Sequence, residues 1–90
     1  MRAIKTTSAF KKDYKRVQKR GHSKEKLEYL LSLLVADESL PASTRPHKLT
    51  GNYANCWECH IEPDWLLIYE LVGDDMLVLR RMGSHADLFK

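Results

Sequence analysis

The alternation of apolar and polar residues predicts a central pair of strands. Residues 57–62 alternate, as in a strand with one buried face, and residues 65–71 are almost all apolar, as in an interior strand. Residues 62–65 read Glu-Pro-Asp-Trp and predict a tight turn, because proline presets the φ angle of its second position. The two strands are therefore expected to form a hairpin around which the rest of the chain is arranged.

The register of this hairpin decides which side chains lie together. A two-residue turn places His60 opposite Leu67. It also puts Glu58, His60 and Glu62 on one face, with Asp64 at the same end of the hairpin as His60. A bulge would shift the pairing by one residue, so the sequence leaves two registers open.

A first helix is predicted well ahead of the hairpin. Phe10, Tyr14 and Val17 recur at helical spacing and form its apolar face. Ser8 is a good N-cap residue for this helix, and Gly21 ends it.

A second helix carries a stripe of leucines, and Ser23 is its expected N-cap. The leucines recur at positions i, i+3, i+4 and i+7: Leu27, Leu30, Leu31 and Leu34. This stripe covers barely two heptads, too few for a zipper, so we expect it to pack into the core. The short link between the two helices predicts an antiparallel helical hairpin.

The remaining segments complete an α+β fold. Residues 2–7 are expected to form a first strand, and residues 39–46 a loop marked by two prolines. Residues 51–52 read Gly-Asn and predict a turn, residues 76–82 a last strand, and residues 84–89 a short terminal turn that begins at a serine cap. The element order is β-α-α-β-β-β, with a helical hairpin on one face of a mainly antiparallel sheet.

Length and composition fit one globular domain over residues 1–90. Hydrophobic residues make up 43% of the chain and charged residues 30%, as in an ordinary folded domain. The first residues lack the apolar core of a secretion signal, and no apolar run is long enough to span a membrane. We therefore expect a cytoplasmic protein.

Positive charge is concentrated at the start of the chain. Residues 1–26 carry ten basic and two acidic residues, a balance of +8, whereas residues 27–90 carry five basic and ten acidic residues, a balance of −5. The bases of the first helix are Lys11, Lys12, Lys15, Arg16, Lys19 and Arg20. They form either a solvated helix face or a docking surface for a polyanion or an acidic protein.

The segment Cys56-Trp57-Glu58-Cys59-His60 matches the CxxCH pattern of c-type haem attachment. In an extended strand, however, residues three apart point to opposite faces and lie about 10 Å apart. Cys56 and Cys59 are then too far apart for a shared haem or a disulfide, and zinc would need further ligands. We expect both cysteines to be buried apolar residues, and we expect no metal or cofactor.

Three histidines are each expected where a strand meets a loop, so that a sheet could present them to one cleft: His47, His60 and His85. Asp64, Arg80 and Arg81 are expected near them, while His22 lies in the helix link and is expected at the surface. Histidine suits proton transfer near neutral pH, and a guanidinium offers two parallel donors to a phosphate. These residue types permit cleavage of RNA without a metal, in which the 2′-hydroxyl attacks the adjacent phosphorus.

The chain resembles the YafQ-type toxins of the RelE/ParE superfamily in three stretches, residues 47–51, 60–69 and 81–89. The first reads His-Lys-Leu-Thr-Gly. The second reads His-Ile-Glu-Pro-Asp-Trp-Leu-Leu-Ile-Tyr, and the third Arg-Met-Gly-Ser-His-Ala-Asp-Leu-Phe. The resemblance implies a compact α+β fold like that of microbial ribonucleases and the cleavage of messenger RNA on the translating ribosome.

The resemblance also implies roles for individual residues. The implied catalytic residues are His47, His60, Asp64, Arg81 and His85, and the implied RNA contacts are Trp65 and Phe89. We expect His85 to be the general acid and His60, with Asp64, to be on the base side, while His47 shares either task. Pro46 stands where these toxins often carry an acidic residue, which leaves the partner of His47 open.

The implied partners are a cognate acidic antitoxin of the DinJ or RelB kind, the ribosome and its mRNA. The free toxin is expected to be monomeric, and the basic helix face is expected to dock on ribosomal RNA or on the antitoxin. The alternative is a toxin of the ParE kind, which shares the fold and acts by binding DNA gyrase without nuclease chemistry.

Overall fold

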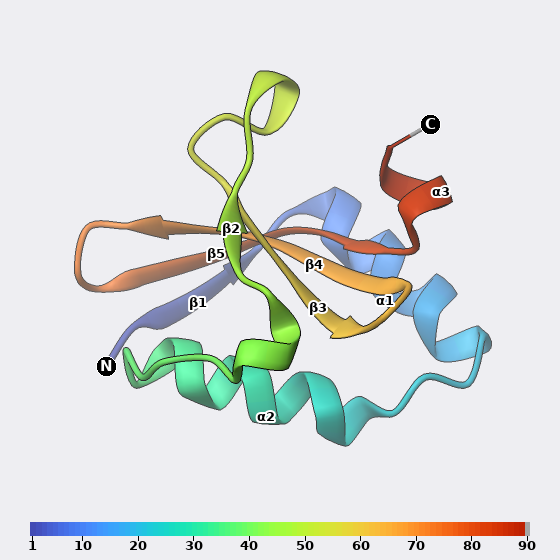
Figure 1. Ribbon diagram of the computed structural model, residues 1–90, viewed down its shortest axis with the longest axis horizontal. Helices are drawn as coiled ribbons and strands as arrows, with labels where there is room; N and C mark the ends of the chain where they lie inside the picture. The colour runs from blue at the N-terminus through green and yellow to red at the C-terminus, as the bar shows by residue number, and fades with distance from the viewer. Residues whose placement is uncertain (90) are drawn as a thin grey trace.

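Five strands form one sheet in the order β1-β5-β4-β3-β2, in which β1 runs parallel to β5 and the other pairs are antiparallel. The computed structural model describes residues 1–89 (Figure 1). The strands are β1 (Ala3–Thr6), β2 (His47–Lys48), β3 (Trp57–Glu62), β4 (Trp65–Val72) and β5 (Met76–Gly83). The helices are α1 (Ser8–Lys19), α2 (Lys24–Val35) and α3 (His85–Leu88), with 3-10 turns at Ala42–Thr44 and Gly51–Tyr53. The predicted α+β class and element order are confirmed, with one short strand, β2, added after the predicted loop of residues 39–46, where the sequence predicted no strand.

Helix α1 begins at a threonine cap. The Thr7 hydroxyl accepts a hydrogen bond from the Phe10 backbone N–H at 3.0 Å and donates one to the Arg80 carbonyl at 2.8 Å. The prediction of Ser8 as the cap was therefore wrong by one residue, because Thr7 is the last extended residue and its oxygen reaches the first free N–H groups. Helix α2 begins after Ser23, as predicted. No helix within residues 1–89 is long and apolar enough to cross a membrane.

The main core lies between the two long helices and one face of the sheet. Its helical side consists of Phe10, Val17, Leu27, Leu30 and Leu34, and its sheet side includes Trp65, Leu67, Tyr69, Leu77, Leu79 and Met82. The leucine stripe is thus part of the core, as predicted. A smaller cluster on the opposite face joins Cys56, Leu66, Ile68 and Leu88. We call this second side the open face, because α1 and α2 do not cover it.

The two cysteines are buried and unbridged, as predicted. Cys59 belongs to the main core and Cys56 to the smaller cluster, so they lie on opposite faces of the sheet. Burial raises the pKa of the Cys59 thiol to about 12, which keeps it protonated at neutral pH. Neither side chain has the setting of a reactive thiolate.

A bulge near Ile61 shifts the register of the β3–β4 hairpin. His60 pairs with Leu66 and Glu62 with Trp65, so the expected pairing of His60 with Leu67 was wrong by one residue. The extra residue reverses the alternation beyond it. Glu62 therefore contacts His22 and Lys26 on the helical side and does not share the open face with His60.

A second irregularity lies in β5 beside Arg80. Ile68 pairs with Arg81 and Tyr69 with Leu79, which leaves Arg80 as the extra residue. Leu79 and Met82 consequently both reach the main core, and both arginines lie outside it. Strand alternation in the sequence predicts Arg80 and Arg81 on opposite faces, and this prediction is wrong because the extra residue breaks the alternation.

Candidate active site

Three histidines from three elements meet on the open face of the sheet. His47 comes from β2, His60 from β3 and His85 from the first turn of α3. The ring centres of His47 and His60 are 6.4 Å apart, and those of His60 and His85 are 5.7 Å apart. The structure thus brings together the three histidines that the sequence predicted to share a cleft.

Carbonyl groups orient two of these rings. The Nδ1 atom of His47 lies 3.0 Å from the carbonyl oxygen of Arg45, and that of His60 lies 3.4 Å from the carbonyl oxygen of Thr44. A carbonyl oxygen only accepts, so each Nδ1 carries the proton in this arrangement. The Nε2 atom of His47 lies 3.3 Å from a carboxylate oxygen of Glu58.

His85 is held by Asp64. One oxygen of this carboxylate accepts hydrogen bonds from the His85 backbone N–H at 2.9 Å and from its Nδ1 at 2.7 Å. These two bonds, the backbone one first, lower the pKa of Asp64 below its ordinary value. Asp64 was expected on the base side with His60. It instead contacts His85, because the β3–β4 turn ends beside the start of α3.

Ser84 and Gly83 fix the start of α3. The Ser84 hydroxyl accepts from the Asp87 N–H, and the Asp87 carboxylate accepts from the Ser84 N–H at 2.9 Å, which completes the predicted cap. A Cβ atom at Gly83 would lie 2.8 Å from an Asp87 oxygen, so this close approach requires glycine. His85 is therefore presented from a rigid turn.

A pocket of about 430 Å³ opens beside the histidine cluster. His60 and His85 line it together with residues of the preceding loop and of the hairpin end: Ser43, Arg45, Ile61, Glu62 and Pro63. Two of the three histidines of the cluster, His60 and His85, thus face this one pocket. A nucleotide segment that entered it would meet both proton-transfer groups.

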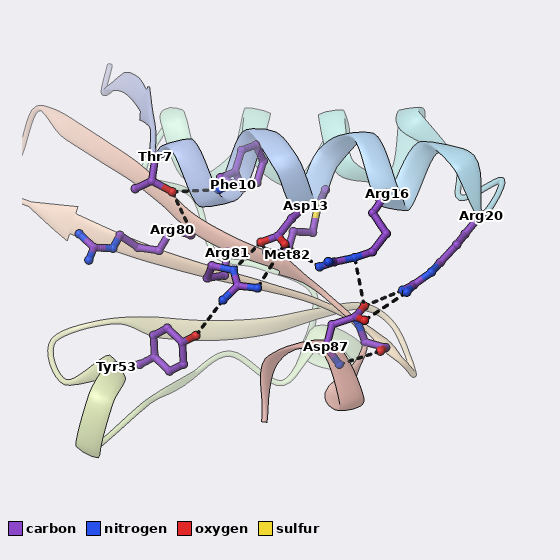
Figure 2. A network of polar contacts seen from close by, with 11 residues as sticks. Thr7, Phe10, Asp13, Arg16, Arg20, Tyr53, Arg80, Arg81, Met82 and Asp87 are labelled. Atoms are coloured by element: carbon purple, nitrogen blue, oxygen red, sulfur yellow. Dashed lines mark hydrogen bonds and ion pairs between the residues drawn. The ribbon is translucent and has the colours of Figure 1, made fainter. Parts of the chain in front are cut away.

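Arg81 is held by a buried carboxylate, Asp13 of α1 (Figure 2). The Asp13 side chain is only 3% exposed and accepts bonds from Arg81 Nε at 2.6 Å and from its Nη2 at 3.2 Å. It also accepts from Arg16 at 2.6 Å and from the Met82 backbone N–H at 3.0 Å. Asp13 raises the pKa of Arg81, whose remaining Nη1 lies 3.4 Å from the Tyr53 hydroxyl.

Arg81 lies three strands away from His47. The register aligns His47, Glu58, Ile68 and Arg81 in one row across four strands. Neighbouring strands are about 4.8 Å apart, so three steps separate the Cα atoms of His47 and Arg81 by about 14 Å. Two strands, β3 and β4, therefore lie between the strands of His47 and Arg81.

Two arginines expected to contact RNA are engaged within the protein (Figure 2). Arg20 forms bonds of 2.6 and 3.1 Å to Asp87, and Arg16 pairs with Asp13 and lies 3.7 Å from Asp87. The bond from Arg20 is the main cause of the lowered pKa of Asp87. These arginines attach α3 to α1. The lysines of α1 are exposed and form no ion pairs with the residues that the structure describes, 1–89: Lys11, Lys12, Lys15 and Lys19.

The two aromatic residues expected to contact RNA differ in exposure. Trp65 is only 2% exposed and stacks on His22 at 4.5 Å, so its ring offers no surface to a base. His22 is correspondingly part of the helix–sheet packing and not a free surface residue, as had been expected. Phe89 is 43% exposed and meets Tyr53 edge to face at 6.0 Å, so it remains available for stacking.

Sequence reasoning missed Asp13, Glu58 and Arg45. Asp13 had a signal, since it is the one acid within the basic helix α1. Glu58 is a polar position in the alternation of residues 57–62, yet its side chain is buried, and its contact with His47 depends on β2, which was not predicted. Arg45 stands between Thr44 and Pro46, where a loop reveals nothing about its direction.

The fold and this site together define a small ribonuclease-like α+β protein with proton-transfer groups on the open face of its sheet. Residues 2–90 match the family described as the bacterial toxin of type II toxin–antitoxin systems, YafQ. The chain belongs to this family, which confirms the resemblance found in its sequence.

Individual relatives agree over nearly their whole length. The mRNA interferase toxin YafQ of Escherichia coli strain K12 is 42% identical over 89 residues, which cover 98% of this chain and 96% of the relative. The toxin in the crystal structure of the E. coli DinJ–YafQ complex has a TM-score of 0.90 and 41% identity, with both chains covered completely. A metal-bound toxin from Helicobacter pylori has a TM-score of 0.92 and 34% identity, with 99% and 100% coverage. Within residues 1–89 of the present chain, no three His, Cys, Asp or Glu side chains are grouped to hold a metal ion.

Proposed function

We propose that this toxin is an endoribonuclease that cleaves mRNA on the ribosome in the cytoplasm and thereby stops translation. The observation that carries the proposal is the meeting of His60 and His85 at one pocket, with Asp64 bonded to His85. The name mRNA interferase, given to the E. coli relative, supports the same activity.

His85 is the proposed general acid. Its Nδ1 proton points at the Asp64 carboxylate, which stabilises the imidazolium and leaves the Nε2 proton for the departing 5′-oxygen. His60 is the proposed base, because its Nδ1 faces a carbonyl and its Nε2 can accept the proton of the 2′-hydroxyl. His47, between Glu58 and His60, supports the base side.

Charge and aromatic groups around the histidines bind the RNA in this proposal. Arg81 presents its Nη1 edge to the open face beside Tyr53 and Phe89, although Asp13 compensates its charge. Phe89 stacks on a base, and Trp65 supports the site from the core instead of touching RNA. The exposed lysines of α1 dock on ribosomal phosphates.

The same lysine surface suits an acidic antitoxin. A DinJ protein binds the related E. coli toxin, and we propose a cognate antitoxin of that kind here, with the free toxin monomeric. A gyrase-binding toxin of the ParE kind is not favoured, because it has no need of the histidine cluster.

Single-turnover cleavage on programmed ribosomes tests the proposal. We expect His60→Ala and His85→Ala each to slow cleavage by about 10²–10⁴, as for the loss of a proton-transfer group. His22→Gln, a histidine outside the cluster, is the matched control and should cleave like the parent when folded. A parent toxin that leaves ribosome-bound mRNA intact, or a His85→Ala variant with the parent rate, would contradict the proposal.

A further inference from the structure

The loop before β2 is built onto the histidine cluster. Thr44 is buried, and its hydroxyl and backbone N–H both donate to the Pro41 carbonyl, at 2.7 and 3.0 Å. The carbonyl oxygens of Thr44 and Arg45 then face Nδ1 of His60 and His47. This loop is therefore fixed relative to two proposed catalytic rings, and so is the backbone of Arg45.

Arg45 occupies a backbone conformation that side chains rarely adopt. Its φ and ψ angles are 45° and 59°, in the left-handed region that glycine and asparagine populate most easily. The turn directs the Arg45 side chain to the wall of the pocket shared by His60 and His85. A bulky cation thus stands where the backbone alone favours a small residue.

Arg45 is also unusual in its charge. The other arginines each pair with a carboxylate: Arg2 with Asp37, Arg16 and Arg81 with Asp13, Arg20 with Asp87, and Arg80 with Glu70. Arg45 forms no side-chain hydrogen bond or ion pair within residues 1–89, and its side chain is exposed. It is the one arginine whose positive charge is uncompensated.

We infer that Arg45 binds the phosphodiester of the RNA in this pocket, with its guanidinium on a non-bridging oxygen of the scissile phosphate. Negative charge grows on these oxygens as the 2′-oxygen attacks, and a fixed cation beside them stabilises that change. The guanidinium fork fits two phosphate oxygens and keeps its charge at all working pH values. Arg81 is less suited, since Asp13 occupies two of its donor nitrogens. The inference rests on the proposed nuclease function and names the group that holds its substrate.

The test compares Arg45→Asn with the parent on ribosome-bound mRNA that carries either a normal or a phosphorothioate linkage at the cleavage site. Asparagine tolerates the left-handed backbone, so the fold is kept while the cation is removed. We expect single-turnover cleavage to fall by about 10²–10³, as for the loss of one donor to a developing oxyanion. Sulfur should slow the parent and leave Arg45→Asn little changed, because the contact that sulfur weakens is already gone.

Arg80→Asn is the matched control. It removes the same charge as Arg45→Asn, from an exposed arginine that lies outside the pocket. It should keep the rate and the sulfur effect of the parent, and Arg45→Lys should fall between. A parent that fails to cleave overturns the proposed function itself. A parent that cleaves while Arg45→Asn matches its rate, or is slowed but keeps the full sulfur effect, overturns the role of Arg45 alone.

Discussion

Asp13→Asn tests the contact between α1 and the open face. The two oxygens of Asp13 accept four hydrogen bonds, from Arg16, from two nitrogens of Arg81 and from the Met82 N–H. An asparagine keeps one acceptor oxygen, so in either orientation its amide NH₂ faces two donors. Both guanidinium groups also lose their buried counter-charge.

Removing one partner from a buried charge network costs about 3–5 kcal/mol. A domain of this length has a free energy of unfolding of about 5–13 kcal/mol, at roughly 0.05–0.15 kcal/mol per residue. Each kcal/mol of lost stability lowers the Tm of a domain of this size by about 4–8 °C. We therefore expect Asp13→Asn to fold with a Tm at least about 12 °C below that of the parent.

Urea unfolding followed by tryptophan fluorescence measures this loss. Asp37→Asn is the matched control, because Asp37 also binds an arginine, at 3.0 Å, but its side chain is 82% exposed. That variant should lose no more than about 1 kcal/mol. The double variant Asp13→Asn, Arg81→Gln should lose less than the sum of the single losses, because it removes both charges together. Equal losses at Asp13 and Asp37, or additive losses at Asp13 and Arg81, would refute the network.

Three further predictions concern metal, pH and the arginine fork. The double variant Cys56→Ser, Cys59→Ser should keep cleavage and lose about 1–3 kcal/mol of stability per buried hydroxyl. A chelator should leave the cleavage activity of the parent unchanged. If a chelator abolished cleavage and a divalent ion restored it, a metal would take part. The pKa of Asp87 is lower in the folded state than its unfolded value of about 3.9, so the ionised carboxylate stabilises the fold above about pH 3.9 and this stabilisation is lost as the pH falls below that value. Asp87→Asn should therefore flatten the dependence of the unfolding free energy on pH between about 2 and 4. An unchanged slope would count against the ion pair. Arg81→Lys keeps the charge but offers Asp13 one donor group in place of two nitrogens, so both stability and cleavage should fall, and a lysine variant equal to the parent in both assays would contradict the fork.

The sequence predicted the fold well where local patterns act alone. The alternation in residues 57–62, the leucine stripe of α2 and the serine cap of α3 each determine one element without help from distant residues. The errors lie where one extra residue enters a strand. The bulge near Ile61 and the irregularity at Arg80 each reverse an alternation, and nothing local in the sequence marks either position.

The site was predicted by residue type more accurately than by pairing. The three histidines meet as expected, because β2 pairs with β3 and α3 starts beside the end of the β3–β4 hairpin. Asp64 was given to the wrong histidine, since the choice between His60 and His85 depends on where α3 starts relative to the turn. Asp13 was missed because three of its four hydrogen bonds come from Arg81 and Met82, which lie 68 and 69 residues further along the chain.

The basic residues of this protein divide by type in a way that follows from their geometry. Five of the six arginines form ion pairs with carboxylates, whereas within residues 1–89 only Lys26 among the lysines does so. A planar guanidinium loses less freedom per hydrogen bond than a flexible ammonium, so arginine suits fixed contacts and lysine suits a solvated surface.

On α1 this division puts two tasks on one helix. Its arginines hold α3, which carries His85, while its lysines remain free for an anionic partner. A ligand bound to the lysines of α1 would therefore contact the same helix whose arginines hold α3 and, through it, His85. Arg45 departs from this pattern, since within residues 1–89 it has no carboxylate partner and it lines the pocket of His60 and His85. That departure is what a phosphate-binding residue requires before RNA arrives.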